Sequence, residues 1–154
     1  MGGDNAPEMV VRGAAIAQVR LPHIRFLMVG DEAQLAPLLA EQPNLAAVTT
    51  MRHTEDVVSS SEKPSVALRS GRNSSMRLAI NAVADGEAAS VVSAGNTGAL
   101  MAIAKFVLKM LPGIDRPAIT SFYPTRSGES CMLDLGANLQ CYANNLVQFA
   151  VMGE

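Results

Sequence analysis

The sequence lacks tryptophan, has few aromatic residues and contains no apolar run long enough to cross a bilayer, which takes about 20 residues. Only 17% of its 154 residues are charged, and 12 Lys and Arg nearly balance 14 Asp and Glu. The net charge of -2 therefore gives the chain as a whole no attraction to nucleic acid or to an anionic membrane, although local basic patches remain. Its 49% hydrophobic content predicts a folded globular protein with a real core.

Cysteine is scarce as well. The two cysteines, Cys131 and Cys141, do not have the spacing of a metal site. We expect Cys131 to be buried in an apolar strand and Cys141 to be a reduced structural thiol, because no activating motif surrounds either of them. The sequence begins Met1-Gly2-Gly3-Asp4 instead of with a charged and then apolar leader, so we expect no secretory signal and a cytoplasmic location.

Helical and strand patterns alternate along the chain. The predicted elements are a helix after Pro7, a strand over 24–29, a helix capped by Asp31, a weaker strand over 46–50, a helix capped by Ser74 or Ser75 and stopped by Gly86, a strand over 89–93, a helix from Thr97 to about Lys109, strands over 118–123 and 131–135, and a helix over 144–152. The last two strands are either antiparallel neighbours or separated by a loop at 126–129. Residues 52–72 show no clean period, which predicts an exposed or mobile connection.

This alternation predicts a single α/β domain over residues 1–154, with three α/β/α layers around a mostly parallel sheet. Ligands of such folds bind beyond the carboxyl ends of the strands. Three loops are expected to meet there: Gly2–Asn5, Ser93–Gly98 and Asp134–Asn138. Asp4 and Asp134 are expected to orient their loops by accepting backbone N–H bonds, since a proton-transfer role lacks a paired acid or base.

The most informative stretch runs from Ala88 to Gly98 and reads AASVVSAGNTG. An apolar run crosses a turn of small residues and enters a helix, an order that lets backbone N–H groups converge on an anion. Gly95 and Gly98 allow close approach of the main chain, while Ser93, Asn96 and Thr97 add side-chain donors. Phosphate is therefore the first ligand to consider. The alternative is an ordinary turn in which Asn96 or Thr97 only caps the helix.

Six segments carry a resemblance to a known family. They are MGGDNAP at 1–7, KPSVALRSGRNSSMRLA at 63–79, SAGNTGALM at 93–101, GIDRPA at 113–118, LDLGAN at 133–138 and QFAVMG at 148–153. In this order they resemble the bacterial phosphate acyltransferases, which make acyl-phosphate from acyl carrier protein thioesters for phospholipid synthesis. The resemblance implies a homodimer and a fold similar to that of phosphotransacetylases and isopropylmalate-type dehydrogenases.

The chain also departs from that family. The family has an apolar strand before MGGD and about as much sequence again after QFAVMG, so the chain resembles its N-terminal half. We therefore expect the activity of the parent enzyme to be weak or absent in residues 1–154 alone. Gln140 stands where the family usually has an acidic residue.

The resemblance implies transfer of a fatty acyl group from a thioester to inorganic phosphate, without a metal or an organic cofactor. Positioning and charge stabilisation then dominate the chemistry. Asn96 or Asn138 is expected to donate to the oxyanion, and Arg69 or Arg72 to screen the phosphate charge. The remaining residues expected to bind phosphate or substrate are Gly2, Gly3, Asp4, Ser93, Gly95, Thr97, Gly98 and Asp134.

Acyl carrier protein is acidic, so the expected docking patch is basic; its candidates are Arg69, Arg72, Arg77, Lys105 and Lys109. Nine methionines can help to line an acyl groove, although most are expected in the core. The family's place in lipid synthesis also implies peripheral membrane association. Two other functions are a non-catalytic anion-binding module and a nicotinamide-dependent dehydrogenase, although the second lacks a G-x-G-x-x-G fingerprint. A P-loop nucleotide hydrolase is the weakest of the alternatives, because the G-x-x-x-x-G-K-[ST] motif is absent.

Overall fold

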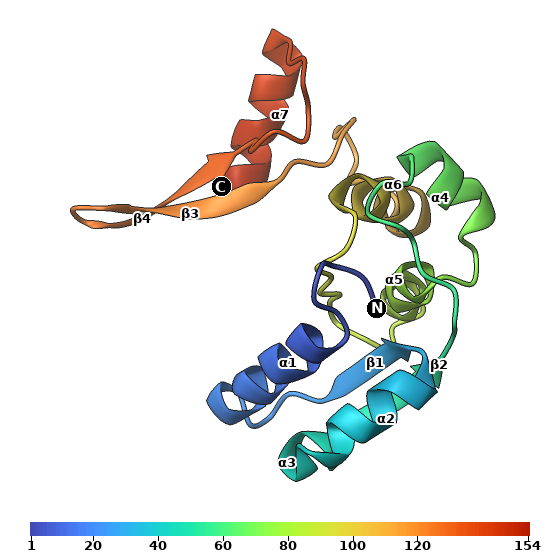
Figure 1. The fold of residues 1–154 in the computed structure, drawn as a ribbon. Helices are drawn as coiled ribbons and strands as arrows, with labels where there is room; N and C mark the ends of the chain where they lie inside the picture. The colour runs from blue at the N-terminus through green and yellow to red at the C-terminus, as the bar shows by residue number, and fades with distance from the viewer. The chain divides into compact units, whose positions relative to one another are not determined.

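A computed structural model describes residues 1–154, which divide into two compact units, Met1–Leu108 and Lys109–Glu154 (Figure 1). Each unit has its own secondary structure. The chain is mixed α/β, with one small parallel and one small antiparallel sheet. The expected single three-layer domain over 1–154 stays a prediction. No helix combines the length and the apolar character that a membrane span requires.

The first unit is built around a short parallel sheet. Its elements are α1 (Glu8–Arg20), β1 (Phe26–Gly30), α2 (Glu32–Ala40), α3 (Pro43–Ala46), β2 (Thr49–His53), α4 (Pro64–Ser70), α5 (Ser75–Ala84) and α6 (Thr97–Leu108). Strands β1 and β2 pair from Phe26↔Thr49 to Gly30↔His53. Because α2 and α3 connect two parallel strands, this segment is a βαβ unit. The strands predicted over 24–29 and 46–50 are confirmed, with their ends displaced by one to three residues toward the C-terminus.

The predicted helix starts follow the capping rules. Asp31 accepts a hydrogen bond from the Ala33 amide at 2.9 Å, and Ser74 accepts one from the Arg77 amide at 3.3 Å. Each side chain thereby satisfies an amide that the first helical turn leaves without a partner. Gly86, with a φ of +75°, follows α5 closely, as expected of a residue that ends a helix.

Two predictions for the first unit are wrong. Residues 89–93 form no strand, because no neighbouring chain pairs with them, and Val92 is 94% exposed. Residues 52–72 are not merely a connection, since they contain α4 and the buried side chains of Val58 and Ala67. Helix α4 spans only seven residues, too few to display a helical period in the sequence.

Two apolar clusters hold the first unit together. One consists of Val58, Ala67, Met76, Ile80, Ala99 and Ile103, and it joins α4, α5 and α6. The other consists of Val11, Met28, Leu35, Leu39 and Leu45, and it joins α1, α2, α3 and β1. The 93–98 turn is connected directly to the first cluster, because α6 begins at Thr97 and contributes Ala99 and Ile103 to it.

The second unit consists of a hairpin and a helix: β3 (Thr120–Thr125), β4 (Gly128–Leu133) and α7 (Ala143–Gly153). The strands are antiparallel, with Thr120 opposite Leu133, so the first of the two predicted arrangements is confirmed. Two hydrogen bonds connect the start of the unit to α7. The Asp115 backbone N–H donates to Gln148 Oε1 at 2.9 Å, and Gln148 Nε2 donates to Asp115 Oδ2 at 2.8 Å.

Cys131 was expected in the core, and this prediction is wrong. The residue lies on β4 and is exposed, because every residue of β3 and nearly every residue of β4 is exposed within this unit. An apolar strand is buried only when both of its faces are covered. Cys141 is also an exposed free thiol.

Candidate functional site

The 93–98 turn leads directly into α6. Ser93 Oγ accepts a hydrogen bond from the Gly95 amide at 3.2 Å. Asn96 Oδ1 accepts one from the Ala99 amide at 3.0 Å, which makes Asn96 the N-cap of α6. The capping role that the sequence analysis considered for Asn96 is therefore confirmed.

The cap leaves other backbone donors of the turn unused. The amides of Ala94, Asn96, Thr97 and Gly98 make no hydrogen bond within the protein. The last three are consecutive and stand at the positive end of the α6 dipole. Consecutive donors at such an end are well suited to bind an anion.

The glycines at 2 and 3 bring a second predicted loop against the turn. A Cβ on Gly3 would lie 2.8 Å from the carbonyl oxygen of Ala94, and one on Gly2 would lie 3.3 Å from Gly95 Cα. Gly3 also has a φ of +97°, which side chains with a Cβ rarely adopt. Only glycine lets the two backbones approach this closely.

A cavity of about 260 Å³ opens beside this contact. Its lining residues are Met1, Gly2, Gly3, Asp4, Ala6, Val57, Val58, Ser59 and Ser60. The turn touches both of its walls, because Ala94 and Gly95 contact the Gly2–Gly3 wall, and Asn96 Nδ2 donates to the carbonyl oxygens of Ser59 and Ser60. Because this volume is below that of a typical pocket for a drug-sized ligand, the cavity suits a small group.

Sequence reasoning missed the Val57–Ser60 wall of this cavity. The three consecutive serines and Pro64 were interpreted as features of an exposed connection. The carbonyl oxygens of Ser59, Ser60 and Glu62 accept hydrogen bonds from Asn96, which lies more than 30 residues away in the sequence. No local sequence pattern predicts such contacts.

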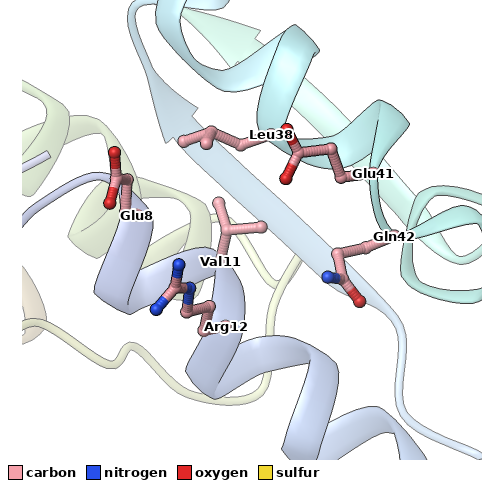
Figure 2. A pocket seen from close by; sticks show the side chains of 6 residues that line it. All are labelled: Glu8, Val11, Arg12, Leu38, Glu41 and Gln42. Atoms are coloured by element: carbon pink, nitrogen blue, oxygen red, sulfur yellow. The ribbon is translucent and has the colours of Figure 1, made fainter.

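A second cavity, of about 230 Å³, lies between α1 and α2 (Figure 2). Figure 2 shows the α1 side chains Glu8, Val11 and Arg12 on one side and Leu38 of α2 on the other, with Glu41 and Gln42 at the end of α2. No residue of the predicted site lines this cavity.

The two predicted arginines lie on or after α4. Arg69 is in the last turn of α4 and Arg72 follows it; both are exposed, and neither forms an ion pair. The opposite end of α4 meets the turn, since a Cβ on Gly98 would lie 2.9 Å from Cγ of Pro64. A role of either arginine in screening phosphate stays a prediction.

Asp134 and Asn138 interact within the second unit. Asp134 Oδ1 accepts from the Ile119 amide at 2.7 Å, while Oδ2 accepts from the amide and Nδ2 of Asn138 at 2.7 and 3.1 Å. Asn138 Nδ2 also donates to the Pro117 carbonyl at 3.1 Å. The expected loop-orienting role of Asp134 is therefore confirmed, whereas the oxyanion role of Asn138 stays a prediction.

Asp134 gives this loop a defined dependence on pH. Burial raises the pKa of its carboxyl, but the hydrogen bonds from Ile119 and Asn138 outweigh burial and hold the pKa below its usual value. The stabilisation is therefore complete above about pH 4, the usual pKa, and is lost as the pH falls through the lowered value.

We expect Asp134→Asn to lower the free energy of unfolding at neutral pH by about 1–3 kcal/mol. The new side-chain NH2 group would replace one of the oxygens that accept from the Ile119 and Asn138 amides, so an amide would lose its acceptor. The difference between the native protein and the variant should shrink as the pH falls below about 4, where the native carboxylate becomes protonated. Denaturant unfolding at a series of pH values measures both effects. A constant difference down to about pH 2 would contradict the proposed role of the ionised carboxylate.

Comparisons with known proteins show which family the chain is similar to. The family described as "Fatty acid synthesis protein" matches residues 1–154. A phosphate acyltransferase of Rhodospirillum centenum is 72% identical over 99% of this chain and 43% of its own length. Phosphate acyltransferases of Paramagnetospirillum magneticum and Rhodospirillum rubrum are 63% and 62% identical over 100% of this chain and 44% of their lengths.

The chain thus spans less than half the length of these relatives. Within that span the family match leaves no residue uncovered. The chain belongs to the fatty acid synthesis protein family.

Proposed function

We propose that the protein carrying this chain transfers a fatty acyl group from acyl carrier protein to inorganic phosphate, giving acyl-phosphate for phospholipid synthesis. Its relatives are named phosphate acyltransferases, and the family name refers to fatty acid synthesis. The observation that carries the proposal is the set of unused amides at Ala94, Asn96, Thr97 and Gly98 beside a small cavity.

The chemistry requires positioning more than a strong base. Phosphate is partly a dianion at neutral pH, so one of its oxygens attacks the thioester carbonyl carbon directly. A C–O bond forms, the carbonyl becomes an oxyanion, and the C–S bond then breaks to release the carrier-protein thiolate, which takes a proton from water. Holding the two reactants together lowers the activation barrier by proximity, and hydrogen-bond donors aimed at the oxyanion lower it further by electrostatic stabilisation.

The amides of Thr97 and Gly98, helped by the α6 dipole, hold the phosphate in this proposal. Gly2, Gly3 and Gly95 let the backbones close around it, and Ser93 fixes the Gly95 amide. Asp4 lines the cavity. Arg69 or Arg72 screens the anion, and Asp134 positions Asn138 within the second unit.

The remaining features are proposed for the whole protein. It forms a homodimer in the cytoplasm, associates peripherally with the membrane and receives acyl carrier protein on a basic patch. Its complete fold is the three-layer α/β/α arrangement of the phosphotransacetylase and isopropylmalate dehydrogenase type. No cofactor takes part in the reaction.

Release of the carrier-protein thiol from a long-chain acyl thioester tests the proposal. We expect release that depends on phosphate in a protein of the relatives' full length, and little release from residues 1–154 alone. A matched reaction with sulfate in place of phosphate controls for general ionic effects. Phosphate binding without acyl-phosphate formation would favour an anion-binding module, and absorbance changes of a nicotinamide cofactor would favour a dehydrogenase.

A further inference from the structure

The side chain of Asn96 is fully engaged by the protein. Its Nδ2 donates to the carbonyl oxygens of Ser59, Ser60 and Glu62 at 3.1, 3.2 and 2.9 Å. An amide nitrogen carries two protons, so three acceptors already exceed its supply. Its Oδ1 meanwhile caps α6 through the Ala99 amide. No proton of this side chain is left for a substrate oxyanion in this arrangement.

The segment that Asn96 holds has no other external hydrogen-bond partner. The other hydrogen bonds of residues 59–62 stay within the segment: Ser59 with Ser61, and Glu62 with Ser59. Val58, which is 5% exposed, anchors only the N-terminal end of the segment in the core. Helix α4 anchors the other end, because Pro64 packs close to Gly98 and Ala67 is buried. Asn96 therefore fixes the Ser59–Glu62 segment between two anchored ends.

This segment contributes Ser59 and Ser60 to the lining of the cavity, which Gly2–Asp4 also lines. We infer that Asn96 is a positioning residue, which holds this wall against the 93–98 turn and thereby keeps the cavity beside the turn in one shape. The inferred role in substrate binding rests on the proposed function. Under this inference, backbone amides donate to the oxyanion instead of the Asn96 side chain.

Asn96→Ser separates the two roles of the side chain. Serine caps a helix about as well as asparagine, but it cannot donate to three distant carbonyls while it caps. Asp31→Ser is the matched control, because it replaces the cap of α2 with the same residue and Asp31 makes no contact with residues 57–62. Asn96→Asp is a second variant that keeps the capping oxygen and removes the donors.

The first measurement is hydrogen–deuterium exchange of the full-length protein. We expect the protected amides of this segment, those of Ser59, Ser61 and Glu62, to exchange about tenfold faster in Asn96→Ser and Asn96→Asp. Without the Asn96 donor the segment opens more often, and each opening breaks the hydrogen bonds that these amides make within it. Exchange in α6 should change little in Asn96→Ser, and Asp31→Ser should leave residues 57–62 unchanged. Unchanged exchange at 57–62 in both Asn96 variants overturns the inference.

The second measurement is steady-state kinetics of acyl transfer. A loosened wall leaves the binding-competent cavity only partly populated, so the KM for phosphate should rise by about tenfold in Asn96→Ser, with a smaller fall in kcat. A direct oxyanion donor would instead lower kcat by about 10²–10³-fold with KM little changed, which also overturns the inference. If the native protein shows no acyl transfer, the proposed function fails while the exchange result still decides whether Asn96 holds the segment.

Discussion

Replacing Gly3 with alanine is expected to lower acyl transfer to phosphate by on the order of 10²-fold in the full-length protein, the loss typical of a misplacement of about 1 Å. The new Cβ would lie 2.8 Å from the Ala94 carbonyl oxygen, in a backbone conformation with a φ of +97°. The Gly2–Asp4 loop must then move away from the turn, and the wall that it forms moves with it. Turnover of a long-chain acyl thioester at saturating phosphate measures this loss.

Gly86→Ala is the matched control for this prediction. Gly86 also has a positive φ, of +75°, but no atom lies within 4 Å of its added Cβ. The substitution should therefore cost stability alone, about 1–2 kcal/mol for a left-handed non-glycine residue, and leave acyl transfer unchanged. Equal activity losses in the two variants would show that backbone strain, and not the Gly3–Ala94 approach, is responsible.

Replacing Ile103 with alanine is expected to cause the largest loss of stability, about 2–5 kcal/mol, out of a total of about 5–15 kcal/mol for a typical domain. Ile103 is 0% exposed and belongs to the cluster that joins α4, α5 and α6. Removing its methyl and methylene groups leaves a cavity that the surrounding helices cannot fill completely. Denaturant unfolding, followed by circular dichroism, measures the change.

Ile16→Ala provides the comparison, because it is the same substitution in a helix at a residue that is 56% exposed. We expect a change within about 0.5 kcal/mol, as for most surface substitutions. A cost at Ile16 comparable to that at Ile103 would argue against the core assigned to α4, α5 and α6.

Local rules predicted the longer helices of the chain, whereas the short helices α3 and α4 were missed. Asp31 and Ser74 cap their helices as expected, because capping depends on residues only two or three positions apart. Helix α6 likewise begins at Thr97, where the run of small residues predicted it. Strands were harder to predict, since a strand needs a partner, and residues 89–93 have none. The same dependence on neighbours left Cys131 exposed.

The site was only partly visible in the sequence. Small residues at 93–98 indicated a turn with spare amides, and the structure contains one. The approach of Gly3 to Ala94 and the bonds from Asn96 to Ser59 and Ser60 join residues far apart in the chain. Such contacts depend on the tertiary fold. Sequence alone therefore indicated the unused amides of the turn but not the Val57–Ser60 wall that Asn96 holds.

The location of the thiols affects how the proposed acyl transfer has to be assayed. Cys131 and Cys141 are both exposed and free, and both belong to the second unit. A chromogenic reagent that titrates the free thiol formed on the carrier protein will therefore also react with these two sulfurs and give a burst in every blank. Serine at both positions removes that burst, whereas a single retained cysteine offers an attachment point for a fluorescent reporter outside the 93–98 turn.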